Sequence, residues 1–160
     1  MSPDDVGLHA HVAAIEVDRR TALGVVFVDS LGRVRRRVGR SLSATKDRAA
    51  FQGVLYALWH SRRLGSRRVI VHSDNPAVVA QINGRLEVDL DLVGPYLQVR
   101  ALLNAYRSAR VVGDQVAWAA EARAMAASAL GSGALDNVVV EDLPLWASAR
   151  VDARRGAPVR

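Results

Sequence analysis

The order of β-prone and helical segments constrains this fold more than any other feature of the chain. Three β-prone segments, 11–18, 22–32 and 33–42, follow one another through short connections. This arrangement predicts a meander of three antiparallel strands. From Thr45 the hydrophobic period changes, because Phe51, Leu55 and Leu58 recur at helical spacing in a segment that extends to about Leu64. The chain therefore begins with locally paired strands and continues with a helix.

The second half of the chain alternates between strands and helices. Segment 67–73 is apolar enough for a central strand, and Asn75 and Pro76 suit the start of a helix that stops at Gly84. We interpret 86–93 as a loop, Pro95 as the start of another helix, 109–119 as a strand and 121–130 as the last helix. The order β-β-β-α-β-α-α-β-α predicts an α/β protein, with a mixed five-stranded sheet and helices packed on it.

The composition narrows the class of protein. The 160 residues suit one domain, and the absence of cysteine excludes disulfides and thiol chemistry. The four histidines do not have metal-ligand spacing, no apolar run approaches a membrane span, and the N-terminus lacks a signal-peptide pattern, so we expect a soluble cytoplasmic protein. The net charge of +6 favours contact with nucleic acid, with a basic solvated surface as the alternative.

Four stretches carry a resemblance to a known family: "IEVDRRTALGVVFVDSLGRV", "TKDRAAFQGVLYAL", "VIVHSDNPAVVAQINGRLEVDLDLVGPYLQVRALLNAY" and "EARAMAASAL". Together they resemble type I ribonuclease H, from the first hairpin to the last helix. The resemblance covers roughly residues 10–131. It implies an N-terminal extension at 1–9, a ribonuclease H-like domain at 10–131 and a partly docked C-terminal tail at 132–160.

The resemblance also implies a catalytic site. The family holds two divalent metal ions with four carboxylates, taken from strand one, the first helix, the end of strand four and the last helix. Carried over to this chain, the strand-one acid falls on Asp18 and the strand-four acid on Asp74. The first-helix position holds Ala50, and the last-helix position holds Arg123. An alternative register of the last helix would place Trp118 there, but the first register keeps more apolar positions in phase.

Several alternatives accompany these assignments. Asp47 or Glu121 could replace the missing acids, although both lie out of register. Asp74 could instead cap the following helix, and Asp18 could pair with a neighbouring arginine. If Arg123 occupies the place of a metal ion, its guanidinium should form charge-assisted hydrogen bonds with Asp18 or Asp74.

The basic residues expected to face a nucleic acid are Arg35, Arg36, Arg37, Lys46 and Arg48, because the resemblance places the third strand and first helix on the duplex side. We therefore expect a ribonuclease H-like protein that has lost nuclease activity, needs no cofactor, and binds nucleic acid or a protein partner. The alternative is an active ribonuclease H that uses Mg²⁺ or Mn²⁺ to cleave RNA in RNA–DNA hybrids with a rearranged acid set. A third possibility is a structural scaffold.

The tail contains one apolar segment, "NVVVEDLPLW", at 137–146. It is too apolar to be exposed along its whole length, so we expect it to dock. It could add a strand to a sheet edge, either in its own chain or in the other chain of a homodimer.

Overall fold

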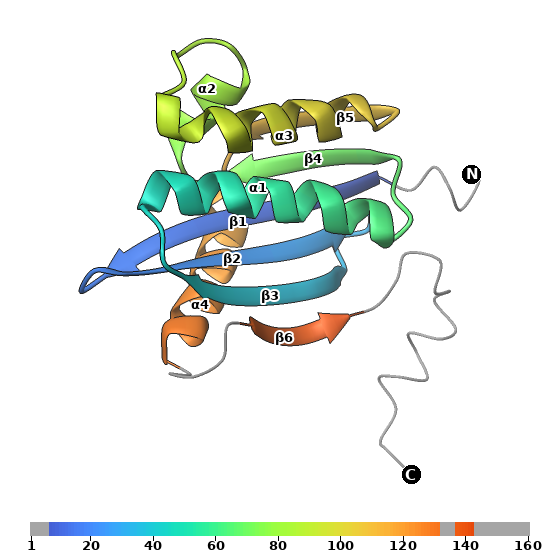
Figure 1. The fold of residues 1–160 in the computed structure, drawn as a ribbon. Helices are drawn as coiled ribbons and strands as arrows, with labels where there is room; N and C mark the ends of the chain where they lie inside the picture. Colours follow the sequence, from blue (N-terminus) through green and yellow to red (C-terminus); the bar gives the residue numbers. More distant parts are fainter. Residues whose placement is uncertain (1–6, 132–136, 143–160) are drawn as a thin grey trace.

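The computed structural model describes residues 7–131 and 137–142, which form one mixed sheet with helices on both faces (Figure 1). The strand order is β5-β4-β1-β2-β3-β6. The strands are β1 (Gly7–Val17), β2 (Arg20–Asp29), β3 (Val34–Leu42), β4 (Arg68–Ser73), β5 (Ser108–Gly113) and β6 (Asn137–Asp142). β1, β2 and β3 form the expected antiparallel meander, and β4 and β5 pair in parallel with their neighbours. The five-stranded mixed sheet is confirmed.

The sixth strand comes from the C-terminal tail. β6 runs antiparallel to β3, with Arg40 opposite Asn137 and Arg36 opposite Asp142. The expectation that 137–146 adds a strand to a sheet edge is therefore met within the same chain, as far as Asp142. The remainder of that segment lies outside the described residues.

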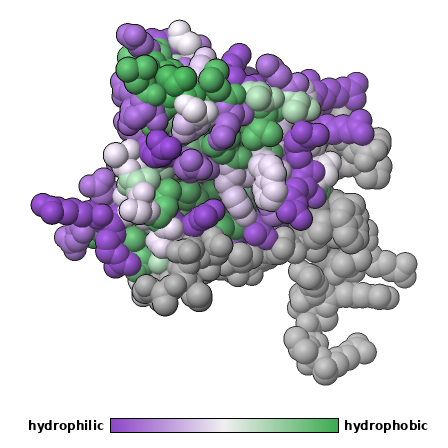
Figure 2. Space-filling model, in the orientation of Figure 1, coloured by the Kyte–Doolittle hydropathy of each residue, from purple (hydrophilic) through white to green (hydrophobic). Residues whose placement is uncertain are grey.

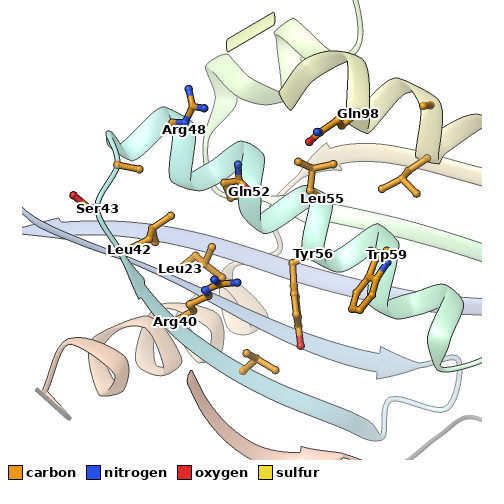
Figure 3. A pocket seen from close by; sticks show the side chains of 14 residues that line it. Leu23, Arg40, Leu42, Ser43, Arg48, Gln52, Leu55, Tyr56, Trp59 and Gln98 are labelled. Atoms are coloured by element: carbon orange, nitrogen blue, oxygen red, sulfur yellow. The ribbon is translucent and has the colours of Figure 1, made fainter. Parts of the chain in front are cut away.

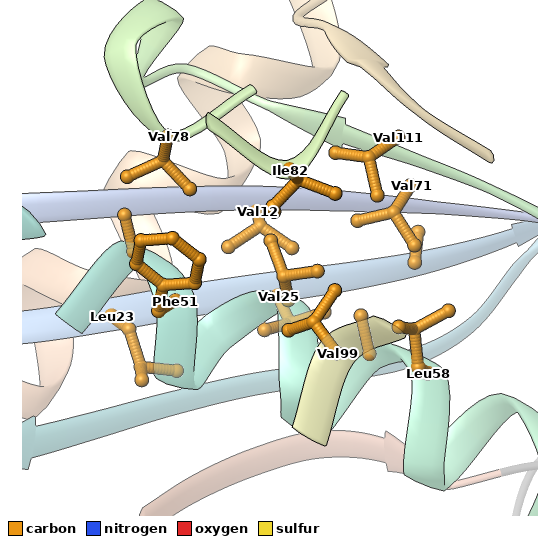
Figure 4. Close-up of a cluster of buried hydrophobic side chains, with 14 of the residues drawn as sticks. Val12, Leu23, Val25, Phe51, Leu58, Val71, Val78, Ile82, Val99 and Val111 are labelled. Atoms are coloured by element: carbon orange, nitrogen blue, oxygen red, sulfur yellow. The ribbon is translucent and has the colours of Figure 1, made fainter. Parts of the chain in front are cut away.

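The helices divide between the two faces of the sheet. α1 (Lys46–Arg63), α2 (Pro76–Ile82) and α3 (Val93–Asn104) lie on one side, and α4 (Val116–Gly131) crosses the other side over β1, β2 and β3 (Figure 1). The main core fills the space between the sheet and α1 (Figure 4). Its largest members include Leu8, Val12, Val25, Phe27, Phe51, Val54, Leu58, Val71, Val78 and Ile82.

Local sequence signals set the helix starts. The Thr45 hydroxyl accepts the Arg48 amide at 3.2 Å, so Thr45 caps α1 as expected. The Asn75 side chain caps α2 by accepting the Val78 amide at 3.1 Å, and Pro76 follows in the first turn. Asp74 is therefore not the cap of this helix.

Two glycines determine how closely α4 approaches the sheet. A Cβ atom built on Gly24 would lie 1.9 Å from the Ala122 carbonyl oxygen, and one built on Gly39 would lie 2.1 Å from that of Met125. Neither strand position can carry a side chain without displacing the backbone of α4. The absence of side chains at these two positions lets α4 lie directly on β2 and β3.

Some predicted boundaries were wrong. β1 begins at Gly7, so residues 7–9 belong to the first strand rather than to an N-terminal extension. β5 ends at Gly113 and α4 begins at Val116, so the strand expected over 109–119 is mostly helix beyond residue 115. α3 starts at Val93, two residues before Pro95, and a 3₁₀ turn, Leu90–Leu92, lies in the expected loop. Among the described residues, no helix combines the length and apolar character that spanning a membrane requires.

Candidate functional site

Asp74 lies directly after β4, beside the middle of β1. Its amide donates to the Val12 carbonyl at 3.2 Å, and its Oδ1 accepts the Ala14 amide at 3.3 Å. The parallel pairing of β4 with β1, in which Val12 is opposite Ser73, fixes this arrangement. Only 9% of the Asp74 side chain is exposed. The end of β4 therefore presents one nearly buried carboxylate against β1.

Arg123 of α4 reaches the same carboxylate. Its Nη1 lies 3.5 Å from Asp74 Oδ2, an ion pair at the long limit of a hydrogen bond, and 45% of the Arg123 side chain is exposed. This contact confirms the expected pairing of Arg123 with Asp74. It also supports the first register of the last helix, because Trp118 lies elsewhere, stacked on the His11 ring at 5.5 Å.

Burial, a hydrogen bond and nearby charges shift the pKa of Asp74 in opposite directions. Burial raises the pKa of Asp74 above its ordinary value, and this is the largest effect. The Ala14 amide and the positive charges of Arg123 and Lys46 lower that pKa, while the carboxylate of Asp114 raises it. Burial outweighs the favourable partners, so the ionised Asp74 is costly at neutral pH.

Asp18 does not lie at this site. It occupies the tip of the β1–β2 hairpin, with φ of +50°, because β1 and β2 remain paired as far as Val17 and Arg20. A strand rises about 3.3 Å per residue, so Asp18 lies about 13 Å along the chain from Ala14. The assignment of Asp18 as the strand-one acid was wrong. The residue of β1 that faces Asp74 is Ala14.

Ala50 and the two acids suggested as substitutes, Asp47 and Glu121, lie in α1 and α4. Ala50 is buried in α1, one turn after Asp47. Asp47 accepts a hydrogen bond from the Asn75 side-chain amide at 2.8 Å, and the proposed substitute Glu121 pairs with Arg37 at 3.6 Å. Both acids thus have other partners.

Asp114, which the sequence interpretation missed, is the other acid that acts on Asp74. It follows β5, the strand beside β4, so it ends its strand as Asp74 ends β4. An acid at the end of a second parallel strand was the available signal. It was overlooked because segment 109–119 was interpreted as one continuous strand.

The donor set does not fit a pair of divalent cations. Mg²⁺ requires several oxygen ligands in close octahedral geometry, preferably carboxylates and water. Here the Asp74 carboxylate is paired with the Arg123 guanidinium, which repels cations, and Asp114 is the other acid that acts on it. Across residues 7–131 and 137–142, no group of three or more histidine, aspartate or glutamate side chains could hold a metal ion.

We expected the side chains of Arg35, Arg36 and Arg37 to face a nucleic acid together, but they have different partners. Arg35 is buried, with its Nε 2.9 Å from Asp29 Oδ2, so its expected contact with nucleic acid was wrong. Arg36 donates to the Tyr56 hydroxyl at 3.0 Å on the α1 side, whereas Arg37 pairs with Glu121 of α4 on the other side. Successive side chains of a strand point to opposite faces, so this run cannot form one footprint.

Lys46 and Arg48 remain close to the site. Both lie in the first turn of α1, and the charge of Lys46 acts on Asp74. Arg48 donates to the Asp91 carbonyl at 2.9 Å, which ties α1 to the turn before α3. Lys46 of α1 and Arg123 of α4 therefore bring positive charge to Asp74 from helices on opposite sides of the sheet, whereas Arg48 contacts Asp91.

A cluster of stacked histidines lies on the face of the sheet that α4 covers. The rings of His9 and His11 from β1 and of His72 from β4 have centroids 4.5–6.3 Å apart and planes within 24° of each other. Burial is the main cause that lowers the pKa of all three, with Arg110 adding to it at His9 and His72, and the pKa of His11 falls to about 3. Sequence spacing concealed this cluster, because strand pairing brings His11 opposite His72.

Comparison with known proteins agrees with this geometry. The family model described as "Reverse transcriptase-like" matches residues 11–125. Among solved structures, the chain resembles RNase H1 of the halophilic archaeon Halobacterium salinarum, with 23% identity, a TM-score of 0.74, and coverage of 79% of this chain and 99% of that one. It also resembles the N-terminal RNase H domain of a Mycobacterium tuberculosis protein, with 22% identity, a TM-score of 0.73, and coverage of 80% and 96%.

A third similar structure is that of LC11-RNase H1 in complex with an RNA/DNA hybrid, with 16% identity, a TM-score of 0.71, and coverage of 78% of this chain and 97% of that one. None of the curated proteins matches the sequence. At these identities the solved structures establish the fold alone, while the family model spans well over half of the chain. The chain belongs to the reverse transcriptase-like family and has the ribonuclease H-like fold.

Proposed function

We propose that this protein is a nucleic-acid-binding module of the ribonuclease H-like fold that does not hydrolyse phosphodiesters by the two-metal route. The observation that carries the second half of the proposal is the Arg123–Asp74 ion pair of 3.5 Å, next to Ala14. A guanidinium stands where the resemblance implies a metal-binding carboxylate. The site is thus neutralised by the protein itself.

Charge supports the first half of the proposal. The chain carries a net charge of +6, and the charges of Lys46 and Arg123 both act on Asp74 at the end of β4. Arginine and lysine bind phosphate through charge-assisted hydrogen bonds, and arginine does so with two parallel donors. LC11-RNase H1 was solved with an RNA/DNA hybrid, and a foamy viral protease-reverse transcriptase with double-stranded DNA. An RNA–DNA hybrid is therefore the first ligand to test.

The binding test compares two double variants with the same change in charge. Lys46→Ala/Arg123→Ala removes two cations beside Asp74. Arg62→Ala/Arg67→Ala removes two exposed cations near the start of β4, about 20 Å away along that strand. Binding of a labelled hybrid is measured by fluorescence anisotropy at several salt concentrations.

We expect Lys46→Ala/Arg123→Ala to bind the hybrid roughly tenfold more weakly. The slope of log K against log salt concentration should be smaller in magnitude by about one to two, because each lost phosphate contact lowers it by about one. The Arg62/Arg67 control should lose much less affinity. Equal losses in the two variants would place the footprint elsewhere. If the wild-type protein binds neither hybrid nor duplex in a salt-dependent way, the nucleic-acid assignment is wrong and a protein-binding scaffold replaces it.

A further inference from the structure

A groove lies between α1, β3 and α3, on the sheet face opposite α4 (Figure 3). Its volume is about 770 Å³. Its walls are mainly apolar, and the side chains that define them include Leu23, Leu42, Leu55, Tyr56, Trp59 and Leu102. Arg40 and Arg48 line the end near the start of α1, whereas Trp59 lines the opposite end. The groove thus offers a long apolar floor with one basic end.

Large apolar side chains of this groove reach the surface. Trp59 is 49% exposed and has the Arg63 guanidinium over its ring, at 4.9 Å from the centroid. Figure 2 shows hydrophobic atoms lying between hydrophilic side chains on the face that presents α1 and α3. Apolar patches of this kind normally receive a ligand or another segment of protein.

The course of β6 indicates which segment fits. Because β6 runs antiparallel to β3, it ends at Asp142 opposite Arg36. The Nε of Arg36 donates to the Tyr56 hydroxyl at 3.0 Å, and Tyr56 lines the groove. The last described strand therefore ends beside the groove, at the end of β3 nearest the C-terminal half of α1 (Figure 1).

The next four residues are Leu143, Pro144, Leu145 and Trp146. Proline has no amide hydrogen for a sheet ladder, so strand pairing is expected to stop there. Four extended residues span about 13 Å, which is sufficient to bring Trp146 from the sheet edge across β3. After them the chain becomes more polar and basic, with Arg150, Arg154 and Arg155. The only strongly apolar part of 143–160 is thus the part that follows β6 directly.

We propose that segment 143–146 folds over the edge of β3 and occupies the groove of its own chain, with its leucine and tryptophan side chains against Tyr56 and Trp59. The bound segment then stabilises the pairing of β6 with β3. This inference is independent of the proposed nucleic-acid function, because it rests on the apolar surface and on the direction of β6.

The test compares two truncated proteins that both keep β6, one ending at Trp146 and one ending at Asp142. Each carries a single cysteine reporter, which is unambiguous because the natural chain has no cysteine. Ala101→Cys lies on α3 in the groove wall, and Ser128→Cys lies on the exposed side of α4, on the other face of the sheet. The rate of maleimide labelling reports access to each position.

We expect the Ala101→Cys reporter to react at least fivefold faster in the protein ending at Asp142 than in the one ending at Trp146. The Ser128→Cys reporter should react at the same rate in both. The melting temperature should also fall by roughly 3–8 °C on removal of 143–146. Trp146→Ala in the full-length chain should produce a smaller change in the same direction.

Equal labelling of Ala101→Cys in the two truncated proteins would overturn the proposal, whatever the melting temperatures are. Protection that increases with protein concentration, together with a dimer in size-exclusion chromatography, would also overturn it. In that case the groove would hold the segment of a second copy.

Discussion

At the scale of single residues, the notable feature of this protein is a nearly buried carboxylate whose partner is a guanidinium. Asp74 receives the Ala14 amide at 3.3 Å and the Arg123 side chain at 3.5 Å. Removing the acceptor leaves the Ala14 amide without a partner, whereas the isosteric neutral asparagine keeps an oxygen that can accept from this amide. This difference allows the role of the Asp74 charge to be separated from the role of its oxygen atoms.

The first prediction concerns Asp74. Its pKa is raised by burial, so the folded state binds the proton more tightly than the unfolded state does. The favourable contribution is present below the unfolded value of 3.8 and is lost as the pH rises through the folded pKa. At pH 7, Asp74→Asn should therefore leave the free energy of unfolding unchanged or raise it by up to about 1 kcal/mol, since an exposed ion pair contributes little.

Asp74→Ala is the matched comparison. It removes the acceptor of the Ala14 amide, so we expect a loss of about 1–2 kcal/mol in the free energy of unfolding. Urea denaturation at pH 7 measures both variants. A large loss for Asp74→Asn would show that the charge itself stabilises the fold, contrary to this account.

The second prediction concerns the histidine cluster. The groups that face it are Arg110 of β5, Asp114 after β5 and Trp118 of α4. The pKa of His11 falls from 6.5 to about 3, so the unfolded chain binds more protons than the folded one between these values. Stability is therefore full above about pH 6.5 and is lost as the pH falls through that window.

His11→Phe should reduce this pH dependence by about 1.4 kcal/mol per pH unit between pH 6 and 4, the slope of one proton. At pH 8, where His11 is neutral in both states, the difference between variant and wild type reports packing alone. Unfolding curves recorded at a series of pH values give the slope. An identical slope in the two proteins would show that His11 titrates normally.

The sequence predicted part of this site and missed another part for identifiable reasons. Asp74 and Arg123 were found because the resemblance assigns one acid position to the end of the fourth strand and another to the last helix. Asp18 was misplaced because β-prone sequence gives the existence of a strand but not the residue at which a neighbouring strand ends against it. Ala14 carries no chemical signal of its own, so only the pairing of β1 with β4 reveals its place.

At the scale of elements, the position of α4 on the sheet is the most tightly constrained by packing. It covers β2 and β3 through Gly24 and Gly39, where a Cβ atom would meet its backbone. It also carries Arg123 to the end of β4 and Trp118 to the histidine cluster. The distance between α4 and the sheet thus determines both the Arg123–Asp74 ion pair and the stacking of Trp118 on His11.

The third prediction follows from this packing. Gly24→Ala should lower the free energy of unfolding by about 1–3 kcal/mol, because overpacking forces the backbone of α4 away from β2. Gly94→Ala is the control, since a Cβ atom there meets nothing within 4 Å and the residue lies in α3. That variant should be neutral or gain up to about 1 kcal/mol. Thermal and urea unfolding measure both, and an equal response to the two substitutions would contradict this role of α4.

Hydrophobic period was sufficient to predict the elements of the domain, because each of them is amphipathic or buried in a regular way. The meander, the four helices and the parallel strands all form where the pattern changes period. The boundary errors arise where the pattern is weak. Segment 109–119 has a strand-like composition throughout, yet the chain must leave the sheet after Gly113 to cross to the other face as α4.

At the scale of the whole molecule, the chain has the ribonuclease H-like fold, and its candidate site holds the Asp74–Arg123 ion pair. The sheet order and the family model place the chain among ribonuclease H-like proteins. A net charge of +6 favours attraction to nucleic acid over a broad surface, and this attraction does not require a catalytic site. Fold and chemistry are thus separable in this protein.

The most direct test of the central claim is cleavage of a labelled RNA–DNA hybrid, in Mg²⁺ and in Mn²⁺, by the wild-type protein and by Asp74→Asn purified in parallel. The asparagine variant keeps the fold and removes the remaining carboxylate, so it separates intrinsic activity from contamination. The account predicts equal cleavage rates in the two preparations, both at the level of the blank. Metal-dependent cleavage by the wild type that Asp74→Asn abolishes would contradict it and would establish an active nuclease with a rearranged acid set.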